Sequence, residues 1–166
     1  LKARRPICDA WECAHDRPYF AASMHRAAPD VVWRAAVCSE IVTEERTHSA
    51  AVLWDAAAFF QSLRHKLIIE RAADTGFPIS FVRLLCKLYS LPRRVSYLGR
   101  VAPPVAPNRG VAAGCSMATT VVKIYCVLPF DQLVLRHPRV QFDAYIDDLQ
   151  VAAQRTENEV TKNVLS

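Results

Sequence analysis

The stretch FDAYIDDLQV, residues 142–151, decides the fold and raises the question of function. In the segment 139–147 apolar and polar residues alternate, as they do in a strand with one buried face: Val140, Phe142, Ala144 and Ile146 on one side, and Gln141, Asp143, Tyr145 and Asp147 on the other. Residues 149–153, LQVAA, predict the returning strand of a hairpin. Adjacent carboxylates repel, and burying either one without a partner is costly. Asp147 and Asp148 therefore form either a solvated turn or a site where a divalent cation supplies the missing charge.

The rest of the chain predicts an α+β fold in which helices pack on one face of a mostly antiparallel sheet. The pattern indicates a strand over 49–56 that reads as fully apolar and ends at Asp55. It also indicates three helices, at residues 30–46 with Asp30 as N-cap, 65–78 and 78–90. Residues 93–105 predict a hairpin with Gly99 near its turn, and residues 114–128 predict a buried helix closed by Pro129. Residues 156–166 could begin one more helix.

Composition describes a globular chain. The 166 residues are 52% hydrophobic and 22% charged, which excludes a disordered protein, and no uncharged apolar run reaches the length of a membrane span. The net charge of +5 is compatible with a phosphate-rich partner without requiring one. The six cysteines form no C-x-x-C pair; Cys8, Cys13 and His15 lie close in sequence but lack a second ligand pair. We expect reduced thiols in a nuclear or cytoplasmic protein without a membrane segment.

The candidate site joins two acidic strand ends. If Asp55 and the doublet Asp147–Asp148 converge, their oxygens suit hard divalent cations, and two such ions about 4 Å apart can drive a phosphoryl transfer. The alternative is that Asp55 caps a helix and the doublet is an exposed turn.

Three motifs in order then resemble reverse transcriptases, over about residues 19–155. YIDD (145–148) resembles their Y/F-x-D-D signature. DAAAFFQSLRH (55–65) is similar to D-x-x-x-F-F-D-x-I-x-H of group II intron and non-LTR retrotransposon enzymes, and RGVAAGCSMAT (109–119) to their R-G-V-x-Q-G-C-P-L-S. The helical stretch 65–90 is similar to the segment that those proteins place between these motifs.

The resemblance implies a polymerase palm that copies an RNA template by adding dNTPs to a DNA primer. Two Mg²⁺ ions, for which Mn²⁺ can substitute, would be held by Asp55 and Asp147, with Asp148 beside them as a carboxylate of the same metal site. Phe60 would exclude ribonucleotides, with its neighbour Phe59 in the core, although Phe60 could itself be a core residue. The remaining nucleotide contacts implied are Ala56, Gly110, Ala113, Gly114 and Tyr145.

The chain also departs from the family pattern. Ala113 replaces a Gln that contacts the nucleotide, Ser116 replaces a Pro, and Gln61 replaces an Asp. The loss of that Gln motivates the alternative of a catalytically decayed domain that only binds nucleic acid. A third reading, an RNA-synthesising polymerase, conflicts with an aromatic ring at Phe60.

The four arginines Arg93, Arg94, Arg100 and Arg109 could bind the template–primer backbone, or they could be ordinary solvated residues. Asp143 is expected to be structural, on the open face of its strand, and His65 to be structural at a helix start. The motif pattern predicts that residues 1–166 are one partial domain truncated at both ends. Remnants of the fingers would lie at 1–50, and the missing fingers and thumb would lie outside the chain.

Overall fold

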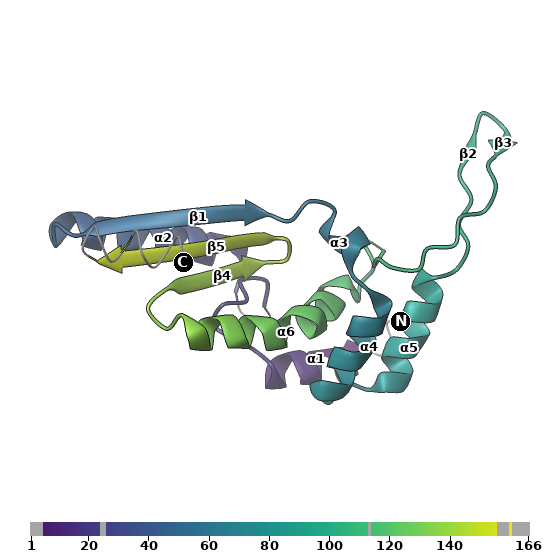
Figure 1. Cartoon of the computed structure of the whole chain (residues 1–166), viewed down its shortest axis with the longest axis horizontal. Coiled ribbons are helices and arrows are strands. Elements are labelled where there is room, and N and C mark those ends of the chain that lie inside the picture. The colour runs from purple at the N-terminus through teal and green to yellow at the C-terminus, as the bar shows by residue number, and fades with distance from the viewer. Residues whose placement is uncertain (1–4, 24–25, 113, 156–159, 161–166) are drawn as a thin grey trace. The chain divides into compact units, whose positions relative to one another are not determined.

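The computed structural model describes residues 5–23, 26–112, 114–155 and 160 (Figure 1). The chain folds as two compact units. The first contains residues 5–8 and 58–128, and the second contains residues 9–57 and those described from Pro129 onward. Helices α1 (Arg5–Ala14) and α6 (Ala118–Arg136) contribute residues to both units. Each unit is described separately.

The second unit is built on a three-stranded antiparallel sheet. Its strands β1 (His48–Asp55), β5 (Asp148–Arg155) and β4 (Gln141–Tyr145) lie in that order, with β5 in the centre (Figure 1). The predicted strands and hairpin are confirmed, but the predicted burial of the first strand is wrong. Because β1 is an edge strand, most of its residues are exposed, and Leu53 keeps 75% of its surface accessible.

One face of this sheet meets helix α2 (Ala28–Glu44) through an ion pair whose carboxylate is buried and whose arginine is partly exposed. Nη1 of Arg34 lies 3.0 Å from Oδ1 of Asp143, in a contact that does not reach hydrogen-bond geometry. The amide of Gln141 donates to the other carboxylate oxygen at 2.7 Å. Asp143 is only 3% exposed, so its predicted place on an open face is wrong, because α2 covers that face. Asp30 lies inside α2 and accepts the N–H of Ala27, the actual N-cap, at 2.6 Å.

The opposite face meets the end of α6. Since side chains alternate along a strand, Phe142 points away from α2, and its ring packs on Phe130 with centroids 4.9 Å apart. Nearby, the guanidinium of Arg17 and the hydroxyl of Tyr19 donate to Asp131. Burial alone would raise the pKa of Asp131, and these hydrogen bonds outweigh it and lower the pKa. The α+β class is confirmed, with helical side chains on both faces of the sheet rather than on one.

The first unit is helical. It contains α3 (Phe59–Ser62), α4 (His65–Asp74), α5 (Ile79–Tyr89) and the first part of α6. The predicted apolar stripe of α5 is buried at Val82, Leu85 and Tyr89, while Ile79 at its start is exposed. Burial raises the pKa of Cys86 to about 11 and, against the opposing charge of Arg71, that of Cys126 to about 12. Desolvation also raises the pKa of Tyr89, as does its contact with Cys115.

Helix α6 does not end at Pro129, as the sequence predicts, but continues to Arg136. A proline inside a helix has no N–H to offer the carbonyl four residues earlier, here that of Tyr125. The guanidinium of Arg71 donates to that carbonyl instead and lies over the Tyr125 ring, 4.6 Å from its centroid. An arginine from α4 thus satisfies the backbone group that Pro129 leaves without a helical donor.

Helix α6 is also long and apolar enough to cross a membrane, judged by length and composition alone. Its mean hydropathy over 18 residues is 1.4, and 44% of that window is buried inside the fold. Core helices of globular proteins meet the same criterion, and eight residues of α6 are buried, from Ala118 to Val127. The apolar character of α6 is therefore accounted for in large part by packing within the chain.

Candidate functional site

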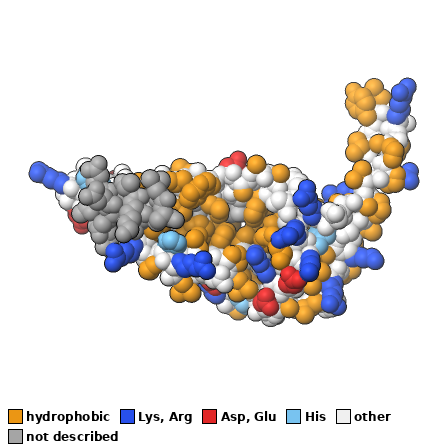
Figure 2. All heavy atoms as spheres, viewed as in Figure 1, with side chains coloured by type: hydrophobic (Ala, Val, Ile, Leu, Met, Phe, Trp, Pro, Cys, Tyr) orange, Lys and Arg blue, Asp and Glu red, His pale blue; other side chains and the backbone are white. Residues whose placement is uncertain are grey.

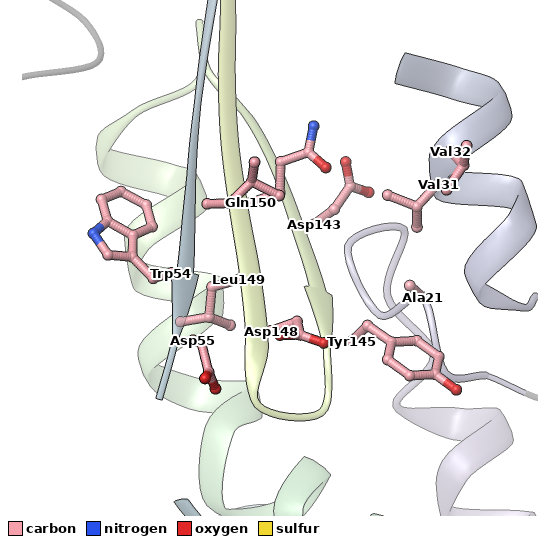
Figure 3. A pocket seen from close by; sticks show the side chains of 11 residues that line it. Ala21, Val31, Val32, Trp54, Asp55, Asp143, Tyr145, Asp148, Leu149 and Gln150 are labelled. Atoms are coloured by element: carbon pink, nitrogen blue, oxygen red, sulfur yellow. The ribbon is translucent and has the colours of Figure 1, made fainter. Parts of the chain in front are cut away.

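Two of the predicted catalytic residues are cross-strand partners at the end of the sheet. Asp55 closes β1 and Asp148 opens β5, and the register places them directly opposite each other (Figure 3). Residues paired in this way share one face, with Cβ atoms about 4.5–5.5 Å apart. Both side chains are exposed. Neither forms an ion pair with any lysine or arginine in the part of the chain that the structure describes.

The third carboxylate lies in the turn of the same hairpin. Tyr145 pairs with Asp148, so the turn consists of Ile146 and Asp147 alone. Ile146 has φ 61°, a left-handed conformation that is strained for a β-branched residue. The Asp147 carbonyl accepts the N–H of Ala56 at 3.1 Å, which ties the turn to the backbone just after β1. Nothing in the local sequence signals this strained turn, because β-branched residues usually avoid it.

A pocket of about 470 Å³ opens beside the carboxylate pair, entirely within the second unit. Its walls are mostly apolar, with Val31 and Val32 from α2, Leu53 and Trp54 from β1, and Leu149 from β5 (Figure 3). The polar groups Asp55, Asp143, Tyr145, Asp148 and Gln150 also line it. Apolar walls with a few convergent polar groups are typical of small-molecule sites.

The donor set of this site fits a magnesium ion only in part. Among the residues that the structure describes, no three His, Cys, Asp or Glu side chains are arranged to hold a metal, and this includes Cys8, Cys13 and His15. Magnesium is commonly held by one or two carboxylates, with waters and substrate phosphates completing its shell. The exposed residues Asp55 and Asp148 offer one or two such carboxylates, and within the described part of the chain no three-carboxylate group forms.

The predicted nucleotide contacts Phe60 and Gly110 lie close together in the first unit. The Phe60 carbonyl accepts the N–H of Val111 at 2.8 Å, and Gly110 donates to Leu63 at 2.8 Å. At Gly110, with φ 92°, an added Cβ would lie 3.1 Å from the backbone of Gln61. The close approach that requires this glycine is therefore made to the chain itself.

Three other predictions concern residues near Phe60 and Gly110 in the fold or in the sequence. His65 begins α4, and its Nε2 lies 2.7 Å from the Gly110 carbonyl, in agreement with the structural role predicted for it. Gly114 has φ 80° and open space around it. Ala113 lies outside the described residues.

Three of the four predicted nucleic-acid-binding arginines lie in or beside a small hairpin of the first unit. Strands β2 (Ser96–Tyr97) and β3 (Arg100–Val101) are joined by Leu98 and Gly99, which have φ 46° and 74° (Figure 1). Positive φ at both turn residues is the type I′ geometry that suits a two-residue hairpin. Arg93 and Arg94 precede β2, and Arg100 starts β3; all three are exposed. The fourth, Arg109, precedes Gly110, and its backbone pairs with that of Arg64 in an isolated antiparallel β-bridge.

Sequence reasoning missed the charged contacts that support the second unit. The ion pair of Arg34 with Asp143 joins α2 to the sheet, and that of Arg17 with Asp131 joins the segment after α1 to α6. Their partners are far apart in the chain, and the alternation of β4 indicated the wrong environment for Asp143. No signal in a single sequence identifies such pairs.

No protein-family model and no curated protein matches the chain. Solved structures do match it. The apo telomerase of Candida tropicalis, truncated from the C-terminal domain, has a TM-score of 0.70 and 13% identity, over 99% of this chain and 36% of that one. The telomerase of Candida albicans in complex with a fragment of telomeric RNA has a TM-score of 0.67 and 11% identity, over 99% and 33%. The chain spans about a third of these telomerases, and its fold is similar to that part of them.

Proposed function

We propose that the chain is the palm of an RNA-directed DNA polymerase of the kind found in group II introns and non-LTR retrotransposons. The observation that carries this proposal is the cross-strand pair of Asp55 and Asp148, which has no cationic partner among the described side chains. The reverse-transcriptase-like fold supports it, as does the order of the three sequence motifs.

In this proposal Asp55 and Asp148 hold divalent ions, with Asp147 beside them in the turn. Bound Mg²⁺ would lower the pKa of the primer 3′-hydroxyl and neutralise charge on the departing pyrophosphate. Strand pairing sets the backbones of Asp55 and Asp148 opposite each other before any ligand arrives, and the bond from Ala56 to the Asp147 carbonyl ties the turn to the end of β1. This preorganisation is what transition-state stabilisation requires.

The substrate would be a dNTP on an RNA template with a DNA primer. Tyr145 lies opposite Asp148 and lines the pocket, where its ring can meet a sugar or base. Phe60 belongs to the first unit, and discrimination against a 2′-hydroxyl at this residue is what the sequence resemblance implies. The RNA fragment in the Candida albicans telomerase structure supports nucleic acid as the class of partner.

Primer extension on an RNA template by the full-length protein tests the proposal. Asp55→Asn and Asp148→Asn should each reduce Mg²⁺-dependent extension by at least about 100-fold, because electrostatic stabilisation at the reacting phosphate is lost. Asp74→Asn, which removes an exposed carboxylate at the end of α4, is the matched control and should retain activity. If Asp148→Asn extended primers as well as the wild type does, Asp148 would not be a catalytic carboxylate and the proposal would lose its main support.

A second candidate is a decayed domain that binds nucleic acid without extending primers. It is favoured by the absence of a three-carboxylate group among the described residues and by Ala113 in the sequence. Paramagnetic Mn²⁺ distinguishes the two candidates. Line broadening at the amides of Asp55 and Asp148 supports the catalytic reading. Salt-sensitive binding of template–primer with neither broadening nor extension supports the decayed one.

A further inference from the structure

We infer that the β2–β3 hairpin is a binding element for single-stranded nucleic acid, in which an unpaired base stacks on Tyr97 beside Arg100. The inference rests on the nucleic-acid partner of the proposed function and not on its chemistry. Two features carry it: the charge of the surrounding segment, and the side chains that the hairpin exposes.

The hairpin lies in a segment without any acidic residue. From Thr75 to Phe130 the chain contains no Asp or Glu and seven basic residues: Arg83, Lys87, Arg93, Arg94, Arg100, Arg109 and Lys123. Over 56 residues the net charge is therefore +7, whereas the whole chain carries +5. Figure 2 shows blue and orange side chains on the hairpin. Because six of these seven side chains are exposed, the segment complements a polyanion, and nucleic acid is a polyanion that also offers bases to an exposed aromatic ring.

The exposed side chains of the hairpin supply a surface for a base. Tyr97 and Arg100 are directly opposite each other, so their side chains share one face of the ribbon. Tyr97 is 75% exposed and Leu98 at the tip is 84% exposed. An aromatic ring next to a guanidinium plane is the arrangement on which unpaired bases stack, and arginines such as Arg93 and Arg94 can meet the flanking phosphates.

The geometry favours a single strand over a duplex. Stacked base pairs hide the faces of their bases, so a duplex would engage the arginines and leave Tyr97 and Leu98 in water. The hairpin is already ordered for binding: Arg93 and Val105 exchange hydrogen bonds of 2.9 and 2.8 Å, and Ala102 donates to Val95 at 2.9 Å. An ordered platform loses less entropy when it binds than a free loop does.

Fluorescence anisotropy with a labelled single-stranded RNA of about 12 nucleotides tests the inference, since site sizes of about 4–16 nucleotides are usual for such proteins. The full chain is used, in EDTA and without nucleotides, so that the carboxylate pair plays no part. Tyr97→Ala should weaken binding roughly tenfold, and Tyr97→Phe should bind within about twofold of the wild type, because stacking needs the ring and not the hydroxyl. The blunt duplex of the same sequence should bind more weakly than the single strand and be insensitive to Tyr97→Ala.

The controls separate stacking from charge and from folding. Leu135→Ala, at a 79% exposed residue of α6, removes a comparable apolar side chain outside the hairpin and should leave binding unchanged. Arg94→Gln should lower the slope of log K against log salt by about 0.7. Because binding is measured in EDTA and without nucleotides, the result is independent of primer extension, which distinguishes this inference from the catalytic proposal.

Three results would overturn the inference: no binding by the wild type, equal binding by Tyr97→Ala, or equal affinity for duplex and single strand. A dimer that dissociates in Leu98→Asn would identify a second copy of the chain as the occupant of the hairpin and would also overturn it.

Discussion

The β4–β5 and β2–β3 hairpins have turns of the same length but expose opposite chemistry. Each turn has two residues and forces a non-glycine residue to positive φ, Ile146 in one and Leu98 in the other. The β4–β5 hairpin belongs to a three-stranded sheet, in which Asp148 pairs with Asp55 of β1. The β2–β3 hairpin has no third strand among the described residues, and its side chains are exposed and include no acidic group.

The difference shows where each hairpin obtains its order. The β4–β5 turn is held by tertiary contacts, including the bond from Ala56 to Asp147, so it can tolerate strain and like charges. The β2–β3 hairpin depends on its own backbone bonds and the type I′ turn. Tertiary contacts thus stabilise the strained β4–β5 turn, whereas the β2–β3 hairpin is stabilised by its own bonds.

The largest expected effect is a loss of stability at high pH in the helical unit that carries the β2–β3 hairpin. Burial raises the pKa of Cys86 to about 11 and that of Cys126 to about 12 from 9.0, so folding favours their protonated forms. Their contribution to stability is full below about pH 9 and is lost as the pH rises through 11 and 12. Urea denaturation at pH 8 to 12, followed by amide signals of α5, should show this decline. Cys86→Ala should reduce it, and a flat profile would contradict it.

A smaller effect on the unfolding free energy is expected where β4, in the β4–β5 hairpin, meets α2. Arg34→Met leaves the Asp143 carboxylate buried with only the amide of Gln141, and should cost about 3 kcal/mol of unfolding free energy. Arg94→Met makes the same change beside the β2–β3 hairpin, and it should change the unfolding free energy by no more than about 0.5 kcal/mol. Chemical denaturation measures both. Equal effects would show that Arg34 does not stabilise the sheet.

The next largest effects on stability are expected from substitutions in the β2–β3 and β4–β5 turns. Leu98→Asn should stabilise the β2–β3 hairpin by about 1 kcal/mol, because Asn tolerates the left-handed conformation and Asn-Gly is the preferred type I′ pair. Ile146→Asn should gain less, since the partly buried Ile146 also loses packing. Hydrogen exchange at Ala102 and Val105 reports on the first turn and exchange at Ala56 on the second. Faster exchange at Val105 in Leu98→Asn would contradict the assigned turn type.

The smallest effect distinguishes repulsion from attraction at the carboxylate pair. Like charges directly opposite in a sheet are destabilising, so Asp148→Asn should raise the unfolding free energy by about 0.2–1 kcal/mol in EDTA. Adding Mg²⁺ should stabilise the wild type more than the variant, because only the wild type keeps both carboxylates. Thermal unfolding with and without Mg²⁺ measures this, with Asp74→Asn as the control. A lower stability of Asp148→Asn in EDTA would show that Asp148 has an attractive partner.

Local patterns predicted most of the elements. The alternation in β4, the stripe of α5 and the Gly99 turn are properties of neighbouring residues, and each is found in the structure. The wrong predictions depend on distant partners. Arg34 makes Asp143 a buried residue, and Arg71, 54 residues from Tyr125, allows α6 to continue past Pro129. A single sequence contains no sign of which arginine reaches which carbonyl or carboxylate.

The candidate site was predictable to a similar extent. The acidic strand ends were visible, but which aspartate faces Asp55 depends on the length of the turn after Tyr145. A two-residue turn places Asp148 there and leaves Asp147 in the turn. The glycine at position 110 was visible too, but the backbone it approaches, that of Gln61, follows only from the packing of the first unit.

The acid-free segment has a practical consequence for protein chemistry. A protease that cuts only after Asp or Glu has no cleavage site between Asp74 and Asp131, whereas trypsin can cut the exposed hairpin at Arg93, Arg94 and Arg100. Digestion at acidic residues should therefore release α5, the β2–β3 hairpin and most of α6 as one strongly cationic peptide. Protection of the hairpin arginines from trypsin by single-stranded RNA would then map the contact on the intact chain.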